Sequence, residues 1–125
     1  MQQAATAYTK VAQATQSPRE LEAAILMKAA TRLQAIRDDW DGRRRELFEA
    51  LTYNRKLWTI LVSSTTEADN PLPVGIKQNV ANLGIFIFNH TLAVMTQPAP
   101  ERLAILIDIN REIAAGLRGP AAQDA

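Results

Sequence analysis

The sequence predicts an all-α fold, a small bundle of four to five helices. Apolar residues recur at intervals of three and four, prolines and glycines separate these patterns, and the one strand-like run lacks a hairpin signal. We expect helices over residues 3–15, 18–40, 43–63, 73–96 and 100–117. Residues 1–125 suit a single helical domain, which we expect to end in a short flexible tail after residue 119.

The composition excludes several classes of site. Fourteen Lys and Arg against 13 Asp and Glu leave a formal charge of +1, so no overall charge attracts nucleic acid or acidic lipid. Without cysteine, the chain has no disulfide, no thiolate zinc site and no cysteine nucleophile. It also has neither a long apolar run nor an apolar signal-peptide core at its start. We therefore expect a soluble, cytoplasmic protein with no membrane insertion.

The first two expected helices differ in strength. In residues 3–15, only Tyr8, Val11 and Thr15 make a one-sided pattern, which is weak. The helix over 18–40 begins more clearly, because Ser17 can cap it, Pro18 suits its first position and Glu20 completes a capping box. Its apolar stripe consists of Leu26, Ala29, Leu33, Ile36 and Trp40.

The helix over 43–63 follows "DDWDG", where we expect a break near Gly42 and a cap at Asp41. Two parallel stripes give this helix a wide apolar face. The first consists of Leu47, Leu51, Asn54, Trp58 and Leu61, and the second of Ala50, Tyr53, Leu57 and Ile60.

The last two helices are marked by their apolar content and their boundaries. The helix over 73–96 contains "ANLGIFIFNHT" and is apolar on most sides after Val80, so it is either central in the bundle or covered by a partner. The helix over 100–117 starts at Pro100, and we expect Gly116 and Gly119 to end it.

No pattern of catalytic residues emerges. His90, the only histidine, lies on an apolar stripe with no acidic residue between Asp69 and Glu101, which favours a structural role. The "RRR" run at 43–45 has acidic neighbours and no interleaved aromatic residues, so a solvated helix start explains it better than an RNA site. Common enzyme motifs are missing. We expect no enzyme activity, no cofactor, no metal site and no small-molecule substrate.

Two asparagines on apolar stripes, Asn54 and Asn110, allow two interpretations. They can fix the register of packed helices within the monomer, which is the simpler interpretation. Alternatively, Asn54, Arg55 and Trp58 share one helix surface and recognise a partner, because such residues often anchor interfaces.

Four segments resemble the FlaF family of bacterial flagellar proteins. They are "SPRELEAAILMKAATRL", "LTYNRKLWTIL", "NPLPVGIKQNVANLGIFIFNHT" and "INREIAAGLRG", in that order, and the resemblance extends from Tyr8 to Gly119. It implies a small helical, non-enzymatic protein that promotes flagellin production as a flagellin chaperone. The alternative that it implies is control of flagellin translation, through RNA or through the regulator FlbT.

Flagellin before export has amphipathic terminal segments, so the resemblance suggests recognition of a flagellin helix in an apolar groove. The candidate partner-binding residues come from three of the expected helices. We expect an anchor at Trp58 beside Asn54, apolar surface on helix 73–96 and polar pairing at the rim. The residues are Asn54, Arg55, Trp58, Leu83, Phe86, Phe88 and Arg111.

Overall fold

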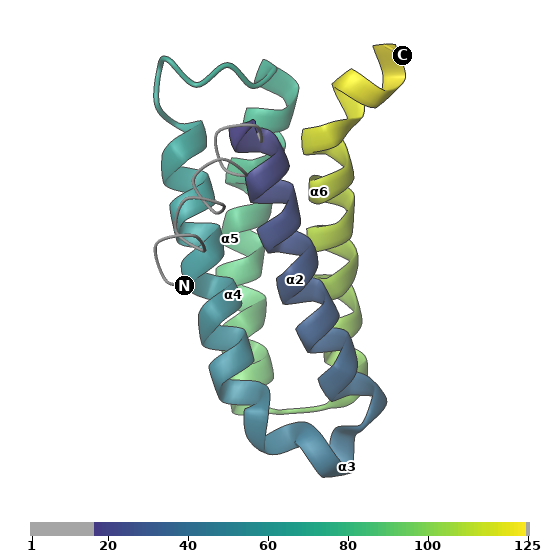
Figure 1. Ribbon diagram of the computed structural model, residues 1–125. Coiled ribbons are helices and arrows are strands. Elements are labelled where there is room, and N and C mark those ends of the chain that lie inside the picture. The colour runs from purple at the N-terminus through teal and green to yellow at the C-terminus, as the bar shows by residue number, and fades with distance from the viewer. Residues whose placement is uncertain (1–16, 125) are drawn as a thin grey trace, which may run out of the picture.

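The computed structural model describes residues 17–124 as an antiparallel bundle of four long helices (Figure 1). The long helices are α2 (Pro18–Asp38), α4 (Leu47–Thr65), α5 (Val74–Thr96) and α6 (Ala104–Asp124). The short ones are α3 (Trp40–Arg43) and the 3₁₀ turns η1 (Arg44–Glu46) and η2 (Pro100–Leu103). The all-α prediction is confirmed, whereas the helix expected over 3–15 lies outside the described residues.

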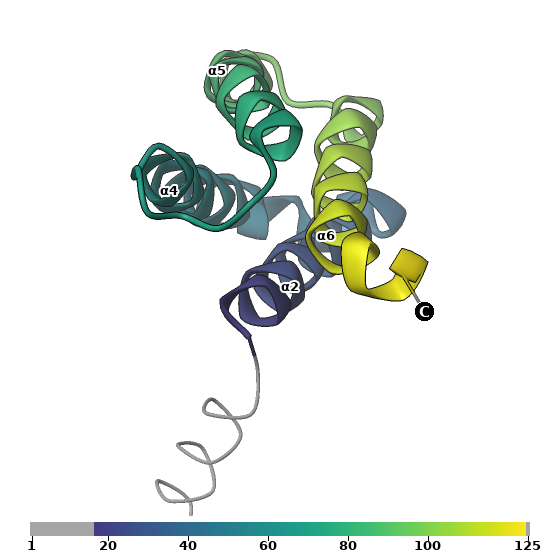
Figure 2. The ribbon, with the colours of Figure 1, turned by 90° about the horizontal axis from the view of Figure 1, so that it is seen from above.

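Seen along its axis, the bundle places α2 between α4 and α6, with α5 diagonally opposite α2 (Figure 2). The most extensive helix contacts are α2 with α6 and α4 with α5, followed by α2 with α4. The α5–α6 contact is smaller. The bundle therefore consists of two tightly packed helix pairs that share one core.

The start of α2 agrees with the sequence. Ser17 has extended backbone angles, and its hydroxyl oxygen accepts a hydrogen bond from the Glu20 backbone N–H at 3.1 Å. The predicted capping box is wrong, because the Glu20 carboxylate turns to α6 and accepts a hydrogen bond from Nε of Arg118 at 3.3 Å. Glu20 thus ties the first turn of α2 to α6.

The corner between α2 and α4 differs from the prediction. The helix ends at Asp38, and the backbone breaks at Asp39 (φ −129°, ψ 60°) rather than at Gly42. Gly42 lies inside α3, where a Cβ atom would approach Oδ2 of Asp39 to 2.6 Å. This glycine permits close approach instead of ending a helix. Asp41 lies in the first turn of α3 and is not the cap, and α4 begins at Leu47 because residues 44–46 form a 3₁₀ turn.

The last helix is longer than predicted. We expected Gly116 and Gly119 to end it, but α6 continues to Asp124. A glycine ends a helix by adopting a positive φ, and none of the glycines in the described part of the chain does so. Both glycines therefore act as ordinary helical residues, and the helix extends into the predicted tail.

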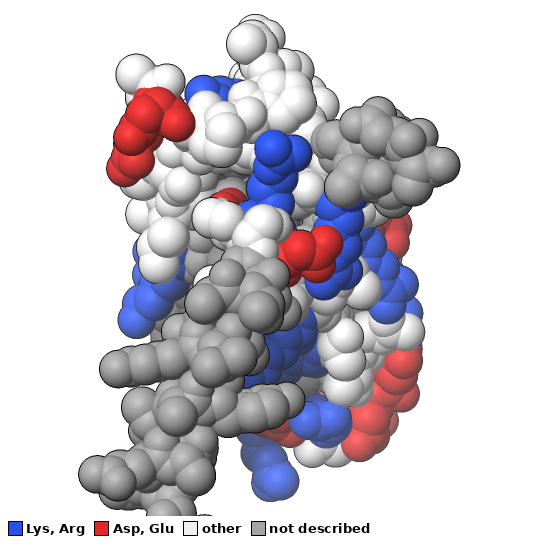
Figure 3. Space-filling view, turned by 45° about the horizontal axis from the view of Figure 1, so that its top comes forward, with Lys and Arg blue, Asp and Glu red and all other residues white. Residues whose placement is uncertain are grey.

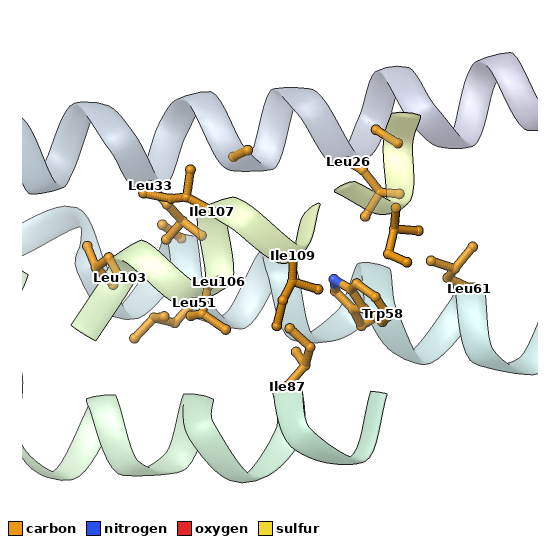
Figure 4. Packing of buried hydrophobic residues seen from close by; sticks show 14 of the residues in the cluster. Leu26, Leu33, Leu51, Trp58, Leu61, Ile87, Leu103, Leu106, Ile107 and Ile109 are labelled. Carbon is orange, nitrogen blue, oxygen red and sulfur yellow. The ribbon is translucent and has the colours of Figure 1, made fainter. Parts of the chain in front are cut away.

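The core is formed by the stripes that the sequence predicts (Figure 4). Leu26 and Leu33 of α2, Leu51 and Trp58 of α4, and Ile87 of α5 are fully buried. In Figure 4 the Trp58 ring lies between the helix that carries Ile87 and the helix that carries Leu26. The turn η2 contributes Leu103, and the helix α6 contributes Leu106, Ile107, Ile109, Ile113, Ala114 and Leu117.

Asn110 of α6 connects three helices inside this core. Its Oδ1 accepts a hydrogen bond from Nε1–H of Trp58 at 2.8 Å. Its Nδ2 donates to Oδ1 of Asn54 at 2.7 Å and to the carbonyl oxygen of Leu26 at 3.3 Å. Asn54, Trp58 and Asn110 are all 0% exposed. Because each bond joins α4 or α2 to α6, the network fixes the register of these helices, as the simpler interpretation predicts.

The α4–α5 pair packs closely at Gly84. This glycine is buried in α5, and a Cβ atom there would lie 2.6 Å from Cγ2 of Val62. Val62 is β-branched and has little rotamer freedom in a helix. Gly84 is therefore required by the approach of α4, even though glycine weakens a helix.

Replacing Asn110→Ala should lower the free energy of unfolding by about 3 kcal/mol or more. The change leaves Nε1–H of Trp58 and Oδ1 of Asn54 buried without their partner, at about 1–3 kcal/mol for each group. Urea unfolding measures the loss, with the exposed Asn89→Ala as the matched control. Equal urea midpoints for the two variants would contradict the role given to Asn110.

Replacing Gly84→Ala should also destabilise the protein, because overpacking costs about 1–3 kcal/mol and exceeds the gain in helix propensity. The same change at Gly116, where a Cβ atom meets nothing within 4 Å, should stabilise it. In a Val62→Ala background, Gly84→Ala should become stabilising, which a double-mutant cycle tests by thermal unfolding. A Gly84→Ala penalty that persists without the Val62 methyl groups would show that another contact causes it.

Candidate functional site

An apolar groove runs along the surface between α2 and α4, with a volume of ≈ 420 Å³. We call it the α2–α4 groove. Ile25 and Glu22 line it from α2. The lining residues of α4 are Tyr53, Lys56, Leu57, Ile60, Leu61 and Ser64. Leu61 is buried, Ile25 and Leu57 are half-buried, and Ile60 is 70% exposed, so apolar side chains form both the floor and the edge.

The groove extends further along α2. Tyr53 also lines a second hollow, of ≈ 750 Å³, which is more basic than the α2–α4 groove. Its α2 side contains the short residues Ala29, Thr31 and Ala35 together with Lys28 and Arg32, and Arg43 of α3 completes the lining. At the other end, Glu22 and Ser64 also line a hollow of ≈ 370 Å³ beside Ser17 and Pro18. The concave surface therefore follows α2 from its first residues to Ala35.

Glu22 is the one acidic residue of the α2–α4 groove lining. Its Oε2 is buried and has no hydrogen-bond partner among the described residues. Burial raises the pKa of the Glu22 carboxyl above 4.5, because the charged form loses hydration. The groove therefore combines a mainly apolar lining with one carboxylate close to the start of α2.

The structure contradicts the proposed surface of Asn54, Arg55 and Trp58. Asn54 and Trp58 are fully buried and belong to the Asn110 network, whereas Arg55 is exposed on α4. Trp58 lies on the core side of α4, where Asn110 of α6 supplies the hydrogen-bond acceptor for its indole N–H. The expectation of a surface anchor at Trp58 is therefore wrong.

The remaining candidates lie on different parts of the bundle. Leu83 and Phe88 of α5 are half-buried and pack against the core, so they offer little free surface. Phe86 is 42% exposed. Arg111 of α6 is exposed and donates a hydrogen bond to Oε1 of Gln34 on α2. The structure does not bring the seven candidates together in one site.

The contacts of His90 serve the structure, as the absence of a carboxylate near it in the sequence suggests. Its Nε2–H donates to the carbonyl oxygen of Arg102 at 2.8 Å, which ties α5 to η2. Its ring stacks on Phe86, with the ring centroids 5.3 Å apart and an interplanar angle of 13°. Both contacts hold the ring in place, and neither supplies a carboxylate for acid–base chemistry.

The basic run at residues 43–45 is partly occupied by intramolecular contacts. Arg43 forms two hydrogen bonds with the Glu46 carboxylate, at 2.9 and 3.0 Å. These bonds raise the pKa of Arg43 and lower that of Glu46. The Arg44 guanidinium lies 5.6 Å from the Trp40 ring centroid. Basic and acidic side chains are also interspersed on the face shown in Figure 3, which gives no uniform basic surface there.

Among residues 17–124, no cluster of three or more His, Cys, Asp or Glu side chains could hold a metal ion. No helix in this part of the chain is long and apolar enough to cross a membrane.

The groove residues were visible in the sequence as the second apolar stripe of α4. Of this stripe, Ala50 is buried, whereas Tyr53, Leu57 and Ile60 line the groove. The width of an apolar face predicts that it is covered, but it does not say by which helix. Ile25 of α2 had no signal of its own, since it lies between core positions.

Comparison with known proteins identifies a family. The family model described as flagellar protein FlaF matches residues 4–117. No curated protein and no solved structure matches the chain.

Glu22→Gln should stabilise the protein at neutral pH. A carboxyl whose pKa is raised on folding stabilises the folded state below pH 4.5 and loses this contribution as the pH rises through the raised pKa. The amide stays neutral throughout, so the advantage of the variant should grow from about pH 4.5 towards pH 7. Thermal unfolding across this range measures it, with the exposed Glu112→Gln as control. Parallel pH profiles for wild type and Glu22→Gln would contradict a desolvated carboxylate at Glu22.

Proposed function

The chain belongs to the FlaF family of flagellar proteins, and from this we propose that it is a cytoplasmic chaperone that binds flagellin and promotes flagellin secretion. The observation that carries the proposal is the α2–α4 groove. The protein acts by binding and performs no chemistry.

The shape of the groove suits an amphipathic helix. Such a helix buries side chains at i, i+3, i+4 and i+7 in a long apolar groove and leaves its polar side in water. The lining offers Ile25, Leu57 and Ile60 to those side chains, and the groove continues past Tyr53 along α2. Flagellin before export carries amphipathic terminal segments, which this surface would cover. Covering them would prevent aggregation before secretion.

The proposal moves the binding surface from α5 to the α2–α4 groove. The inner side of α5 is used by the core, and its exposed apolar residues, such as Ile85, do not line any of the groove hollows described above. Ile60 of the groove is equally available, at 70% exposed against 63% for Ile85. The difference is that Ile60 borders a concave surface, which buries more of a bound helix than a convex one does.

Control of flagellin translation remains the alternative function. Acting through RNA, it would need a cluster of free cations, whereas Arg43 is paired with Glu46 and Arg44 lies on Trp40. Acting through FlbT, it would need a protein-binding surface, and a titration with FlbT separates this from direct flagellin binding.

Ile60→Ser should weaken flagellin binding about tenfold, which corresponds to about 1.4 kcal/mol. Calorimetric titration with monomeric flagellin, at two temperatures and at low and physiological salt, measures the affinity. Wild type should bind with a negative heat-capacity change and little salt dependence, because apolar burial drives binding. Circular dichroism should show an unchanged fold, since Ile60 is mostly exposed.

The matched control for this titration is Ile85→Ser, on the outer face of α5. Its affinity should equal that of wild type. If Ile85→Ser weakens binding and Ile60→Ser does not, the surface lies on α5 and the groove assignment is wrong. If wild type gives no binding heat at either temperature, direct flagellin binding is wrong, and FlbT and RNA become the partners to titrate.

A further inference from the structure

The Glu22 carboxylate lies where the α2–α4 groove meets the hollow beside Ser17 and Pro18, because Glu22 lines both. Ser64 of α4 also lines both, so each of the two helices places a polar side chain at this end of the groove. The rest of the groove lining is mainly apolar. A segment that fills the groove up to this end therefore contacts the Glu22 carboxylate.

The described part of the chain does not satisfy this carboxylate. Oε2 of Glu22 is buried and has no hydrogen-bond partner among the described residues. Two cations line the same hollows, Lys56 in the groove and Arg19 in the neighbouring one, yet neither forms a salt bridge with Glu22. The carboxylate of Glu20, by contrast, is paired with Arg118. Within the described residues, Glu22 therefore keeps an acceptor oxygen at the groove that no donor uses.

A segment that covers Glu22 without offering a donor would bind at a cost. Docking removes the water that remains around the carboxylate, and an ionised carboxylate without a partner is unfavourable to bury. A Lys or Arg side chain on the segment avoids this cost, because its N–H groups replace the lost water and its charge compensates that of the carboxylate. Glu22 therefore disfavours apolar segments without a cation at this position and favours those that have one.

We propose that the helix bound in the α2–α4 groove carries a Lys or Arg side chain that pairs with the Glu22 carboxylate, at the end of the groove beside Ser17. This pairing rests on the proposed function, because it names a feature of the flagellin segment that the groove takes. The segment has an apolar side for the groove and one cation at its end. Glu22 is then a residue that determines specificity, and its unfavourable burial in the free protein is compensated in the complex.

Calorimetric titration of the full-length protein with monomeric flagellin tests the pairing. Glu22→Gln keeps the shape of the side chain and removes its charge, so at pH 7 it should bind flagellin about tenfold more weakly than wild type. The same variant should be the more stable of the two at this pH, so weaker binding cannot result from unfolding. The control Glu112→Gln removes an exposed charge on α6 and should bind as tightly as wild type does.

The pH dependence of binding separates a charge pair from a change in shape. Burial raises the pKa of the free Glu22 carboxyl, and a bound cation favours its ionised form. The ratio of the Glu22→Gln dissociation constant to that of wild type should therefore rise from about pH 4.5 towards pH 7. The titrating groups of flagellin are the same in both titrations and cancel in this ratio, as do the other titratable side chains that line the groove and its neighbouring hollow. These side chains are Arg19, Tyr53, Lys56, Glu67 and Asp69.

The pairing agrees with the small salt dependence expected for binding in the groove. The bound helix covers the pair, and salt screens a covered pair much less than an exposed one. The affinity should thus respond to pH and to the charge of Glu22 while it changes little between low and physiological salt.

A double-mutant cycle identifies the cation on flagellin. Lys and Arg residues of its amphipathic terminal segments are replaced by Gln one at a time, and each variant is titrated with wild type and with Glu22→Gln. One replacement should weaken binding to wild type about tenfold and leave binding to Glu22→Gln unchanged, because the pair is already lost there. If no replacement gives this pattern, the pairing is wrong.

Two further results would overturn the pairing and leave the proposed function in place. One is equal affinity of wild type and Glu22→Gln for flagellin while Ile60→Ser still weakens binding. The other is a loss in Glu22→Gln that is the same at pH 4.5 and at pH 7, as a change in shape would give. Self-association of the protein alone that Glu22→Gln abolishes, measured by light scattering, would place the pair between two copies of this chain instead. If wild type does not bind flagellin, the proposed function is wrong and the pairing falls with it.

Discussion

The hydrogen bonds of Asn110 are the constraint on which the bundle depends. Apolar side chains can pack in several registers with similar energy, whereas one amide that must accept from Trp58 and donate to Asn54 and to Leu26 can be satisfied in only one. A misaligned arrangement would leave these groups buried without partners, which costs about 1–3 kcal/mol for each group. The Asn110 network therefore sets how α2, α4 and α6 are aligned, and the core cluster fills the space around it.

This alignment also creates the α2–α4 groove. Because Trp58 and Asn54 must face α6, the second apolar stripe of α4 turns towards α2 and the solvent. Further along this side, α2 offers the short side chains of Ala29, Thr31 and Ala35 and the cationic side chains of Lys28 and Arg32, and a hollow remains between them and Tyr53. Tyr53, Leu57 and Ile60 are thus left at a concave surface by the same bonds that hold the core together. The groove and the register of the bundle have one physical origin.

The close approach of α4 and α5 completes this arrangement. Gly84 lets α5 lie against Val62, and His90 ties the same helix to η2 through the carbonyl oxygen of Arg102. Both features keep α5 in place by packing and hydrogen bonding. The excess of apolar residues in "GIFIF" is therefore partly explained within the monomer, since Ile87 is buried and Phe88 packs against the core.

The sequence by itself determined the helical fold and most of the buried positions, because a period of three to four residues reports one side of a helix whatever that helix packs against. It also determined the family, through motifs spread over residues 4–117. It could not tell which apolar stripe of α4 is core and which is surface, since both have the same period and similar residues. That choice depends on the position of Asn110, which is 52 residues from Trp58 in the chain. Only the tertiary structure brings the two together. It therefore shows that Trp58 belongs to the core and that the groove beside it is open.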